Sequence, residues 1–452
     1  MTTRWATTAL TIALANGACT QPGDGGTPEA TGQTTDESGA SSSGAPSAGV
    51  PSSGPDSGSG TTGGTAEEDA GSGSPETTSS GTLAELIDPL ANRYVDATGA
   101  DPTKAVGMVV VAIAGDDSDV LAYGAKEIGG DPPDPNTHFS IASVSKVLPG
   151  LAVAQQITAG QLTLDTDANE LLGPDLRLPS RSGQSITIEH LLTHYAGLPG
   201  LPVHRLDRDA DGVPDNADTD PTNDIPECCP VAGYTREDFA VELALYETEA
   251  LTLESVPGTQ YTYSNHGNGT LNLVVADGFG YDSGESALRD LVFDPLGMHD
   301  SATHVEPFVS EALANHATGY NDPGSGTLMP LPFLDVGVFA GDVISTGADM
   351  LRLLEAYVHP AASPWPDAVL LALEPLRPTG PGRQIAFAVD IRDEDEARTY
   401  GKGGDYRGYK AFLYFSHDPA TGVVVMMNNG SAGVDARLPA LEIHSALVAA
   451  TR

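Results

Sequence analysis

The sequence predicts an α+β domain in residues 83–452, with one antiparallel sheet built from both ends of the segment and flanked by helices. Two pairs of β-rich runs, each pair separated by a short turn, indicate the sheet. These runs are 106–114 and 120–128 near the start, and 410–416 and 422–428 near the end. Because helical patterns lie between the two pairs, we also expect an inserted, mainly helical region.

Each expected helix rests on its own pattern. The run from Ala142 to Ala159 is expected to form a helix that Pro149 kinks, because proline removes one backbone hydrogen bond. Amphipathic patterns predict three more helices, over 234–246, 345–358 and 434–450. No second linker and no repeat of roughly 20–50 residues interrupts the segment, so we expect it to be a single domain.

The composition limits the partners of the chain. It holds 62 acidic and 21 basic residues among 452, a formal net charge of −41. Nucleic acids are excluded in practice, because phosphate binding depends on Lys and Arg. No uninterrupted apolar run approaches the ~20 residues that span a bilayer. Only five lysines are present, so a lysine beside a candidate nucleophile is informative.

Residues 1–19 have the order of an export signal. Arg4 precedes a mostly apolar stretch, and Asn16-Gly17-Ala18-Cys19 follows it. Cys19 resembles the cysteine of a bacterial lipobox, which implies lipidation at Cys19 and an anchored lipoprotein, periplasmic or at the cell surface. This anchor would be the only membrane contact. Cleavage after Ala15 is the alternative and would release a secreted protein.

Residues 20–82 form a predicted disordered linker of Gly, Ser, Thr, Pro and acidic residues. Val50 is the only large aliphatic residue in it, and no aromatic or basic residue occurs. Such a segment cannot bury enough apolar surface to offset the entropy of ordering. We therefore expect a flexible, self-repelling tether between the export signal and the domain.

A Ser-x-x-Lys pair lies at the start of the helix expected from residue 142. Spacing of three places Ser143 and Lys146 on one helical face. The dipole at a helix N-terminus disfavours an ammonium, and a desolvated, neutral Lys146 could then remove the Ser143 proton. A surface lysine that happens to follow a serine is the alternative. Of the five lysines, only Lys146 has serine three residues before it.

Two further motifs follow in order, Tyr263-Ser264-Asn265 and Lys402-Gly403-Gly404. The order Ser-x-x-Lys, Tyr-x-Asn, Lys-x-Gly resembles the serine hydrolases of the class C β-lactamase and D-Ala-D-Ala carboxypeptidase superfamily. That superfamily also contains esterases and D-amino-acid peptidases. The resemblance covers about 83–452, apart from 201–230, and implies a β-lactamase/transpeptidase-like fold.

The resemblance implies a role for each residue of the proton-transfer group. Ser143 would be the acylated nucleophile and Lys146 its base. Tyr263, with a lowered pKa, would relay a proton to the leaving group and then activate water. Lys402 would hold Tyr263 anionic. No cofactor is implied for catalysis, and a core aromatic remains the alternative for Tyr263.

The same resemblance implies the groups that hold the substrate. Asn265 would hydrogen-bond Lys146 and the substrate, and Lys402 would attract a substrate carboxylate. The oxyanion hole would be the backbone N–H groups of Ser143 and Asp405, the residue after Gly404. The alternatives are a helix cap for Asn265 and a turn for Gly404.

The third motif departs from the β-lactamase pattern. Gly403 stands where those enzymes usually have a hydroxyl residue that helps to bind the drug carboxylate, and acidic Asp405 follows. Both features weaken the case for a carboxylate-bearing substrate, although Arg407 could compensate. His190 and His194 invite a Ser-His-Asp interpretation, but we expect them to serve packing.

An acidic stretch at 203–230 is predicted to be a calcium-binding insertion. Oxygen ligands recur in the calcium-loop order, Gly212 permits the sharp turn, and the whole resembles a thrombospondin type 3 repeat. The predicted ligands are Asp207, Asp209, Asp211, the carbonyl of Val213, Asp215 and Asp218. A solvated acidic loop is the alternative. Cys228 and Cys229 are adjacent and could be a strained vicinal disulfide or two thiols.

These inferences lead to an exported serine hydrolase that acts through an acyl-enzyme on Ser143. A D-alanyl-D-alanine carboxypeptidase-like, penicillin-binding peptidase is the leading interpretation, and a carboxylesterase or β-lactamase is the alternative. The alternative from another class is a non-catalytic, calcium-ordered cell-surface binding protein. We expect a small-molecule or peptidoglycan-derived substrate and a monomer.

Overall fold

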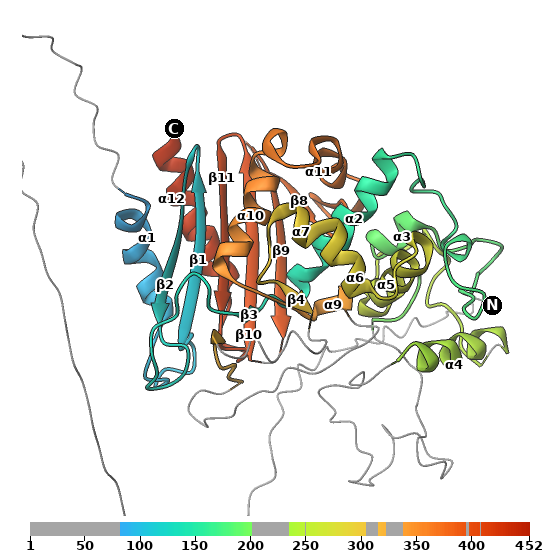
Figure 1. Cartoon of the computed structure of the whole chain (residues 1–452), viewed down its shortest axis with the longest axis horizontal. Coiled ribbons are helices and arrows are strands. Elements are labelled where there is room, and N and C mark those ends of the chain that lie inside the picture. Colours follow the sequence, from blue (N-terminus) through green and yellow to red (C-terminus); the bar gives the residue numbers. More distant parts are fainter. Residues whose placement is uncertain are drawn as a thin grey trace, which may run out of the picture. The chain divides into compact units, whose positions relative to one another are not determined.

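An eight-stranded antiparallel sheet organises the domain, with the strand order β2-β1-β11-β10-β9-β8-β7-β6 (Figure 1). Strands from the two ends of the domain therefore lie side by side, as the sequence predicts. The strands are β1 (Gly107–Ala114), β2 (Asp117–Gly124), β6 (Arg377–Gly380), β7 (Arg383–Ile385), β8 (Asp390–Glu394), β9 (Ala397–Tyr406), β10 (Tyr409–His417) and β11 (Ala420–Met427).

The computed structural model describes residues 82–200, 235–248, 250–303, 315–321, 338–394, 397–406 and 408–452. Several predictions lie outside these residues: the export signal with Cys19, the linker apart from its last residue, the calcium ligands at 207–218, Cys228 with Cys229, and Arg407. None of the helices in the described part combines the length and the hydrophobicity that crossing a bilayer requires.

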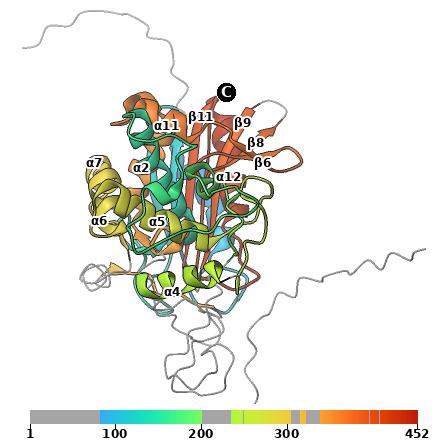
Figure 2. The same cartoon turned by 90° about the vertical axis from the view of Figure 1, so that its right-hand side faces the viewer.

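The alternation of side chains along β1 explains why helices cover both faces of the sheet. Met108, Val110 and Ala112 pack into a core shared with α1 (Leu83–Ala91) and α12 (Arg437–Thr451). The alternate residues Val109 and Val111 pack into the larger core with α2 (Val147–Thr158) and α10 (Gly347–Val358). In Figure 2, α2 lies with the other helices of the inserted region on one side of the strands.

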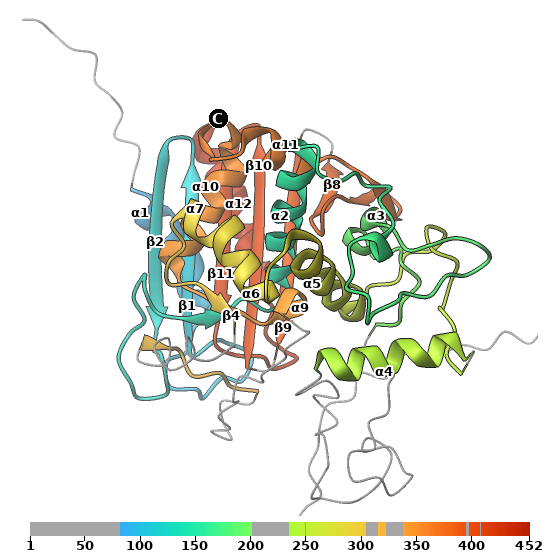
Figure 3. The same ribbon diagram turned by 45° about the vertical axis from the view of Figure 1, so that its right-hand side comes forward.

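The inserted region is mainly helical, as the sequence predicts. Figure 3 shows α3 next to α5, with α4 below them. Besides α2 and α10, its α-helices within the described residues are α3 (Ile188–Leu192), α4 (Arg236–Glu247), α5 (Asn265–Phe279), α6 (Gly284–Leu288), α7 (Asp294–Leu296), α9 (Val338–Gly341) and α11 (Pro366–Ala372). Short helices of other types are η1 (Asn92–Tyr94), η2 (Ala142–Lys146), η3 (Ala168–Glu170), η4 (Arg289–Phe293) and η7 (Pro360–Ala362).

The α+β fold class is confirmed, but the helix expected from residue 142 to 159 is wrong in its first part. Residues Ala142–Lys146 form the 3₁₀ helix η2, and the α-helix starts at Val147. Pro149 therefore lies in the first turn of α2, where a backbone N–H has no helical partner to lose. The helix changes from 3₁₀ to α before this proline, where the sequence had predicted a kink at the proline itself.

Other boundaries differ by a few residues. The second strand ends at Gly124 and not at Ile128. Ser345 is the last residue of strand β5, and α10 begins only after the capping residue Thr346, whose side chain accepts from the N–H of Asp349. A capping threonine satisfies one of the free N–H groups at the helix start, so it fixes where the helix begins.

A small second sheet holds the start of η2 in place. It has the order β3 (Phe139–Ser140), β5 (Val343–Ser345), β4 (Ala302–Thr303) and is antiparallel. The N–H of Ile141, directly before η2, donates to the carbonyl of Val343 at 3.0 Å. The turn that carries the candidate nucleophile is therefore attached to β5.

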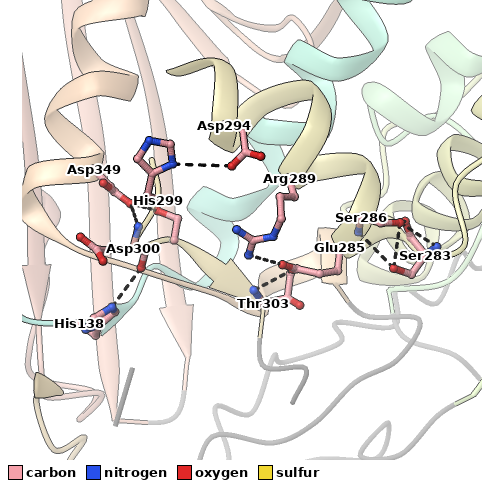
Figure 4. A network of polar contacts seen from close by, with 11 residues as sticks. His138, Ser283, Glu285, Ser286, Arg289, Asp294, His299, Asp300, Thr303 and Asp349 are labelled. Atoms are coloured by element: carbon pink, nitrogen blue, oxygen red, sulfur yellow. Dashed lines mark hydrogen bonds and ion pairs between the residues drawn. The ribbon is translucent and has the colours of Figure 1, made fainter. Parts of the chain in front are cut away.

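Buried carboxylates tie this small sheet to the helices around it (Figure 4). Glu285 on α6 accepts from the backbone N–H of Thr303 at 3.0 Å and from Arg289 at 2.9 Å. Asp349 on α10 accepts from the N–H of Asp300 at 2.9 Å and from the hydroxyl of Ser301 at 2.8 Å. These contacts fix β4, and through β4 they fix β5 and α9.

Candidate active site

Close packing of β9 against η2 builds the centre of the site. Gly404 makes this approach possible, since a Cβ on it would stand 2.4 Å from the carbonyl oxygen of Ile141 and 3.0 Å from the nitrogen of Ser143. Ala142, which precedes Ser143, has a φ of 48°, a conformation that non-glycine residues rarely adopt. Ser143 thus sits on a tight turn facing the strand that carries the third motif.

The hydroxyl of Ser143 lies between an amine and a phenol. Its Oγ is 2.9 Å from the Nζ of Lys146 and 2.9 Å from the hydroxyl oxygen of Tyr263. The structure therefore brings together the serine and the lysine of the Ser-x-x-Lys motif and the tyrosine of the second motif. A base within hydrogen-bond reach of a hydroxyl is the arrangement that nucleophilic catalysis requires.

Lys146 is fully buried, which determines its chemistry. Besides Ser143, its Nζ donates to the backbone carbonyl of Ala340 on α9. Burial lowers the pKa of Lys146, the positive charge of Lys402 lowers it further, and Tyr263 opposes both. An amine with a lowered pKa spends more of its time unprotonated near neutral pH, so it can accept a proton from Ser143.

Tyr263 has an unusually acidic phenol. Burial acts to raise its pKa, but Lys146, Lys402 and the hydrogen bond with Ser143 outweigh burial and lower the pKa to about 8. The amines of Lys146 and Lys402 each lie 5.2 Å from the centre of the Tyr263 ring. The side chain is nevertheless 38% exposed, so it also borders the open cleft.

A buried histidine supports the segment that carries Tyr263. The ring of His194 lies 4.5 Å from the ring of Tyr263, and its Nδ1 accepts from the N–H of Ser264 at 3.2 Å. Burial, followed by the charges of Lys402 and Lys146, lowers the pKa of His194 well below its usual value. His190 belongs to the capping box of α3. Both histidines therefore pack and cap, as we expect from the sequence.

Asn265 is the first residue of α5, and its position follows from the cap of that helix. The hydroxyl of Ser264 accepts from the N–H of Gly267 at 2.8 Å and donates to the carbonyl of Pro199 at 2.5 Å. Asn265 lines the cleft beside Ser143. The hydrogen bond expected between Asn265 and Lys146 is not among those of the described residues, because the lysine amine instead contacts Ser143 and Ala340.

A cleft of about 660 Å³ opens over the nucleophile. Its wall includes the residues of the three motifs for which the sequence predicts a role, with the exception of buried Lys146. Charged residues from β8, β10 and the start of α12 complete the wall. The motif residues in the wall are Ser143, Tyr263, Asn265, Lys402, Gly404 and Asp405, and the added charged residues are Asp390, Lys410, Asp435 and Arg437.

Two of the added charged residues, Lys410 and Arg437, affect which substrates the cleft can bind. Lys410 lies opposite Asp405 in the β9–β10 ladder and forms an ion pair with it at 2.5 Å. Arg437 opens α12, and its buried Nε has no hydrogen-bond partner among the described residues. The sequence carries no local signal for either residue, since both reach the cleft only through the fold. Arg437 is thus a cation of the cleft wall that the sequence did not single out, whereas Arg407 lies outside the described residues.

No cofactor or metal site is evident at the cleft. Within the described residues, no group of three or more His, Cys, Asp or Glu side chains is arranged to hold a metal ion. The predicted calcium ligands lie outside these residues, so the calcium loop stays a prediction.

The chain is similar to several characterised proteins. It is 26% identical to penicillin-binding protein 4 of Amycolatopsis lactamdurans, over 65% of this chain and 72% of that protein. It is 28% identical to esterase EstB of Burkholderia gladioli, over 62% of this chain and 66% of that protein. It is 26% identical to the D-alanyl-D-alanine-carboxypeptidase/endopeptidase AmpH of Escherichia coli K12, over 61% of this chain and 62% of that protein.

Solved structures show the same fold. The octameric penicillin-binding protein homologue from Pyrococcus abyssi superposes with a TM-score of 0.63 at 20% identity, covering 81% of this chain and 77% of that one. The beta-lactamase/D-alanine carboxypeptidase from Yersinia pestis, complexed with citrate, superposes with a TM-score of 0.63 at 17% identity. The superposition covers 82% of this chain and 99% of that one. The expected β-lactamase/transpeptidase-like fold is therefore confirmed.

The family described as Beta-lactamase matches residues 91–447, most of the domain that carries the three motifs. The match spans the segment from α1 to α12 and includes the whole cleft. The chain belongs to the beta-lactamase family and is a serine hydrolase of its fold.

Proposed function

We propose that the chain is an exported, penicillin-binding peptidase of the D-alanyl-D-alanine carboxypeptidase type, which cleaves D-amino-acid peptides such as peptidoglycan stems. One observation carries the proposal: the Ser143 hydroxyl, in contact with a buried amine and an acidic phenol, shares its cleft with the side chain of Arg437. The first group forms an acyl-enzyme, and the second suits a substrate that ends in a carboxylate.

The proposed reaction uses the groups in order. Lys146 takes the proton of Ser143 as Oγ attacks the scissile carbonyl, and the N–H groups of Ser143 and Asp405 bind the oxyanion. The phenol of Tyr263 gives its proton to the leaving amine. Tyr263, now a phenolate, then takes a proton from water, which attacks the acyl-enzyme. As the ester bond breaks, Lys146 returns its proton to the Oγ of Ser143, and both groups regain their starting forms.

Two cations of the cleft support a terminal carboxylate. Asp405 neutralises Lys410, and the wall also holds Lys402 and Arg437 together with the carboxylates of Asp390 and Asp435. Guanidinium groups bind carboxylates with two parallel hydrogen bonds, which also fixes the orientation of the ligand. The names of two relatives, a penicillin-binding protein and a D-alanyl-D-alanine carboxypeptidase, support the same substrate class.

The test is intact-mass spectrometry of the purified protein after incubation with a fluorescent penicillin, beside Ser143→Ala. A stable adduct on the wild type alone, with D-alanine release from a dipeptide-ended stem analogue, supports the peptidase. Rapid loss of the adduct with turnover of the penicillin supports a β-lactamase. No adduct with penicillin, esters or peptides supports the binding-protein alternative.

A carboxylesterase is the second candidate, and one feature favours it. The third motif offers little to a substrate carboxylate, because Gly403 has no hydroxyl and the carboxylate of Asp405 already occupies Lys410, the cation opposite it. The relative named esterase EstB supports this reading. Hydrolysis of short p-nitrophenyl esters, without D-alanine release from the stem analogue, would favour the esterase.

For the remainder of the chain we propose an anchor and a calcium site. The support is in the sequence: Cys19 after an apolar run, then a polar linker, and alternating aspartates in the loop at 207–218. Radiolabelled fatty acid incorporated into the wild type but not into Cys19→Ala tests the anchor. We further propose that the enzyme is a monomer, which light scattering tests.

A further inference from the structure

Asp342 is a buried ionisable group to which the reaction above assigns no part. It lies between α9 and β5 and is 1% exposed. Neither of its carboxyl oxygens has a hydrogen-bond partner among the residues that the structure describes. An ionised carboxylate in such a place is strongly disfavoured unless a cation compensates it. Burial raises the pKa of Asp342 well above its usual value, and the positive charge of Lys146 opposes this rise.

The backbone around Asp342 is fixed against the turn that carries Lys146. Two residues earlier, the carbonyl of Ala340 accepts from the Lys146 amine. One residue later, the N–H of Val343 donates to the hydroxyl of Ser145 at 3.2 Å, and its carbonyl accepts from Ile141. The segment that binds the lysine amine is therefore the segment that carries the carboxyl.

Several other titratable groups lie on the elements around this pair. Tyr263 raises the pKa of Lys146, Lys402 on β9 lowers it, and Asp342 raises it. His194, after α3, has its own pKa lowered by burial and by Lys402 and Lys146. Of the elements packed against α9, α5 carries His266 and α6 carries Glu285. Glu285 is bound to Thr303 and Arg289, and burial lowers the pKa of His266. Lys146 is thus the cation to which Asp342 responds.

We propose that Asp342 is a positioning residue that shares a single proton with Lys146 in the resting enzyme. One form has a neutral amine and a protonated carboxyl, and the other has an ammonium and a carboxylate. Both forms leave the buried pair with no net charge. The inference rests on the proposed role of Lys146 as the base for Ser143.

Only the form with the neutral amine can react. In that form the O–H bond of Ser143 breaks, its proton bonds to the Lys146 amine, and Asp342 keeps its own proton. The new ammonium then balances the oxyanion at the substrate. Asp342 therefore determines what fraction of the resting enzyme has its base ready.

Replacing the carboxyl by an amide makes a quantitative prediction. In Asp342→Asn the lysine titrates alone, whereas in the wild type the first proton leaves either group of the coupled pair. Let n be the total population of the two singly protonated forms divided by the population of the form with the neutral amine. The labelling rate of the variant on its high-pH plateau should then be n-fold that of the wild type. The pH at which the rate reaches half of its plateau should be higher by log n. Two equally populated forms give about twofold and about 0.3 pH unit. Well below both midpoints the two rates should coincide.

The measurement is the second-order rate constant for labelling of Ser143 by a fluorophosphonate, from pH 5 to pH 10, followed by intact mass on the full folded chain. In this reaction Oγ bonds to phosphorus, fluoride leaves, and the proton goes to Lys146. The reagent needs only the nucleophile and its base, so an error in the proposed peptide substrate does not affect it. Ser143→Ala provides the blank.

Asp349→Asn is the matched control, because Asp349 is also a buried carboxyl but is bonded to Asp300 and Ser301. Its acid limb should stay at the wild-type midpoint. Superimposed profiles for Asp342→Asn and the wild type would overturn the proton sharing alone, as would a uniform loss of rate at an unchanged midpoint. No labelling of the wild type would overturn the proposed function as well. Asp342→Ala repeats the test if the asparagine variant fails to fold.

Discussion

Gly404 lies directly against the nucleophile: a Cβ on it would be 3.0 Å from the backbone nitrogen of Ser143. This contact joins the third motif to the first without any side chain. The same Cβ would be 2.4 Å from the carbonyl oxygen of Ile141, a contact that does not occur at real Cβ atoms unless one of the two backbones moves. The glycine therefore sets the distance between β9 and η2, and with it the spacing of the two proposed oxyanion donors.

Gly404→Ala is predicted to cost most of the activity. The strand must move away from Ser143, and loss of one oxyanion donor typically lowers kcat by about 10²–10³-fold. Gly403→Ala is the control, because a Cβ there meets only the ring of Phe412 at 3.4 Å. Comparing kcat and thermal unfolding of the two variants separates the effects. Equal activity in both would show that β9 tolerates the displacement.

The Tyr263 phenol should ionise near pH 8. Ultraviolet difference titration of the wild type against Tyr263→Phe is expected to show one phenolate with a pKa of about 8. Deacylation, which needs the phenolate, should therefore slow as the pH falls below this value. Lys402→Met should move the midpoint upward, because a positive charge beside the ring stabilises the anion.

Lys126→Met is the control for that titration. Lys126 bonds to Asn315 and is not among the groups that act on the Tyr263 pKa. An unchanged midpoint in both lysine variants would contradict the role given to Lys402.

Arg437→Ala is predicted to impair carboxylate-ended substrates selectively. Loss of a charge-assisted hydrogen bond costs about 1.5–3 kcal/mol, so kcat/KM for a D-alanine-ended peptide should fall by roughly 10–150-fold. An uncharged p-nitrophenyl ester supplies the internal comparison and should be hydrolysed at nearly the wild-type rate. A parallel loss on both substrates would mean that the residue only supports the fold at the start of α12.

Calcium should stabilise the protein through the loop at 207–218. At about 100 times the Kd, a ligand that binds only the folded state adds about 2.7 kcal/mol, which should raise Tm by several degrees. Asp209→Asn should abolish the rise, and a chelator should reverse it in the wild type. Asp116→Asn, which changes an exposed acid in the turn before β2, should leave it intact. A rise that survives in Asp209→Asn would refute the predicted loop.

The parts of the site that the sequence predicts are those with a local signature. Ser143 and Lys146 share one turn, and the pattern of the second motif gives Tyr263 and Asn265. Strands β1, β2, β10 and β11 were equally accessible, since β-rich runs and turn residues indicate strands directly. Strands β6 to β9 and the small second sheet were not predicted. The change of helix type before Pro149 was missed because the packing of η2 against β9 decides it, and no local propensity reports that contact.

The remaining groups of the site depend on contacts between distant segments. The carbonyl of Ala340 reaches Lys146 across 194 positions of sequence. Arg437 enters the cleft because α12 begins beside β9 and β10, and a lone arginine at a helix start carries no pattern. Asp342 is one of 62 acidic residues in the chain, and only its burial distinguishes it.

The central pairing of the sheet has a consequence for how the chain folds. Strand β1 pairs with β11, so Met108 lies opposite Met427 and the middle of the sheet joins two distant parts of the chain. Pairings of such long range make folding slow and leave apolar strands exposed until it is complete. The cleft, too, requires β9, β10 and the start of α12, all near the C-terminus. Because β11 joins β1 to β10 and the start of α12 lines the cleft, we expect the enzyme to become active only after β11 and α12 have been synthesised.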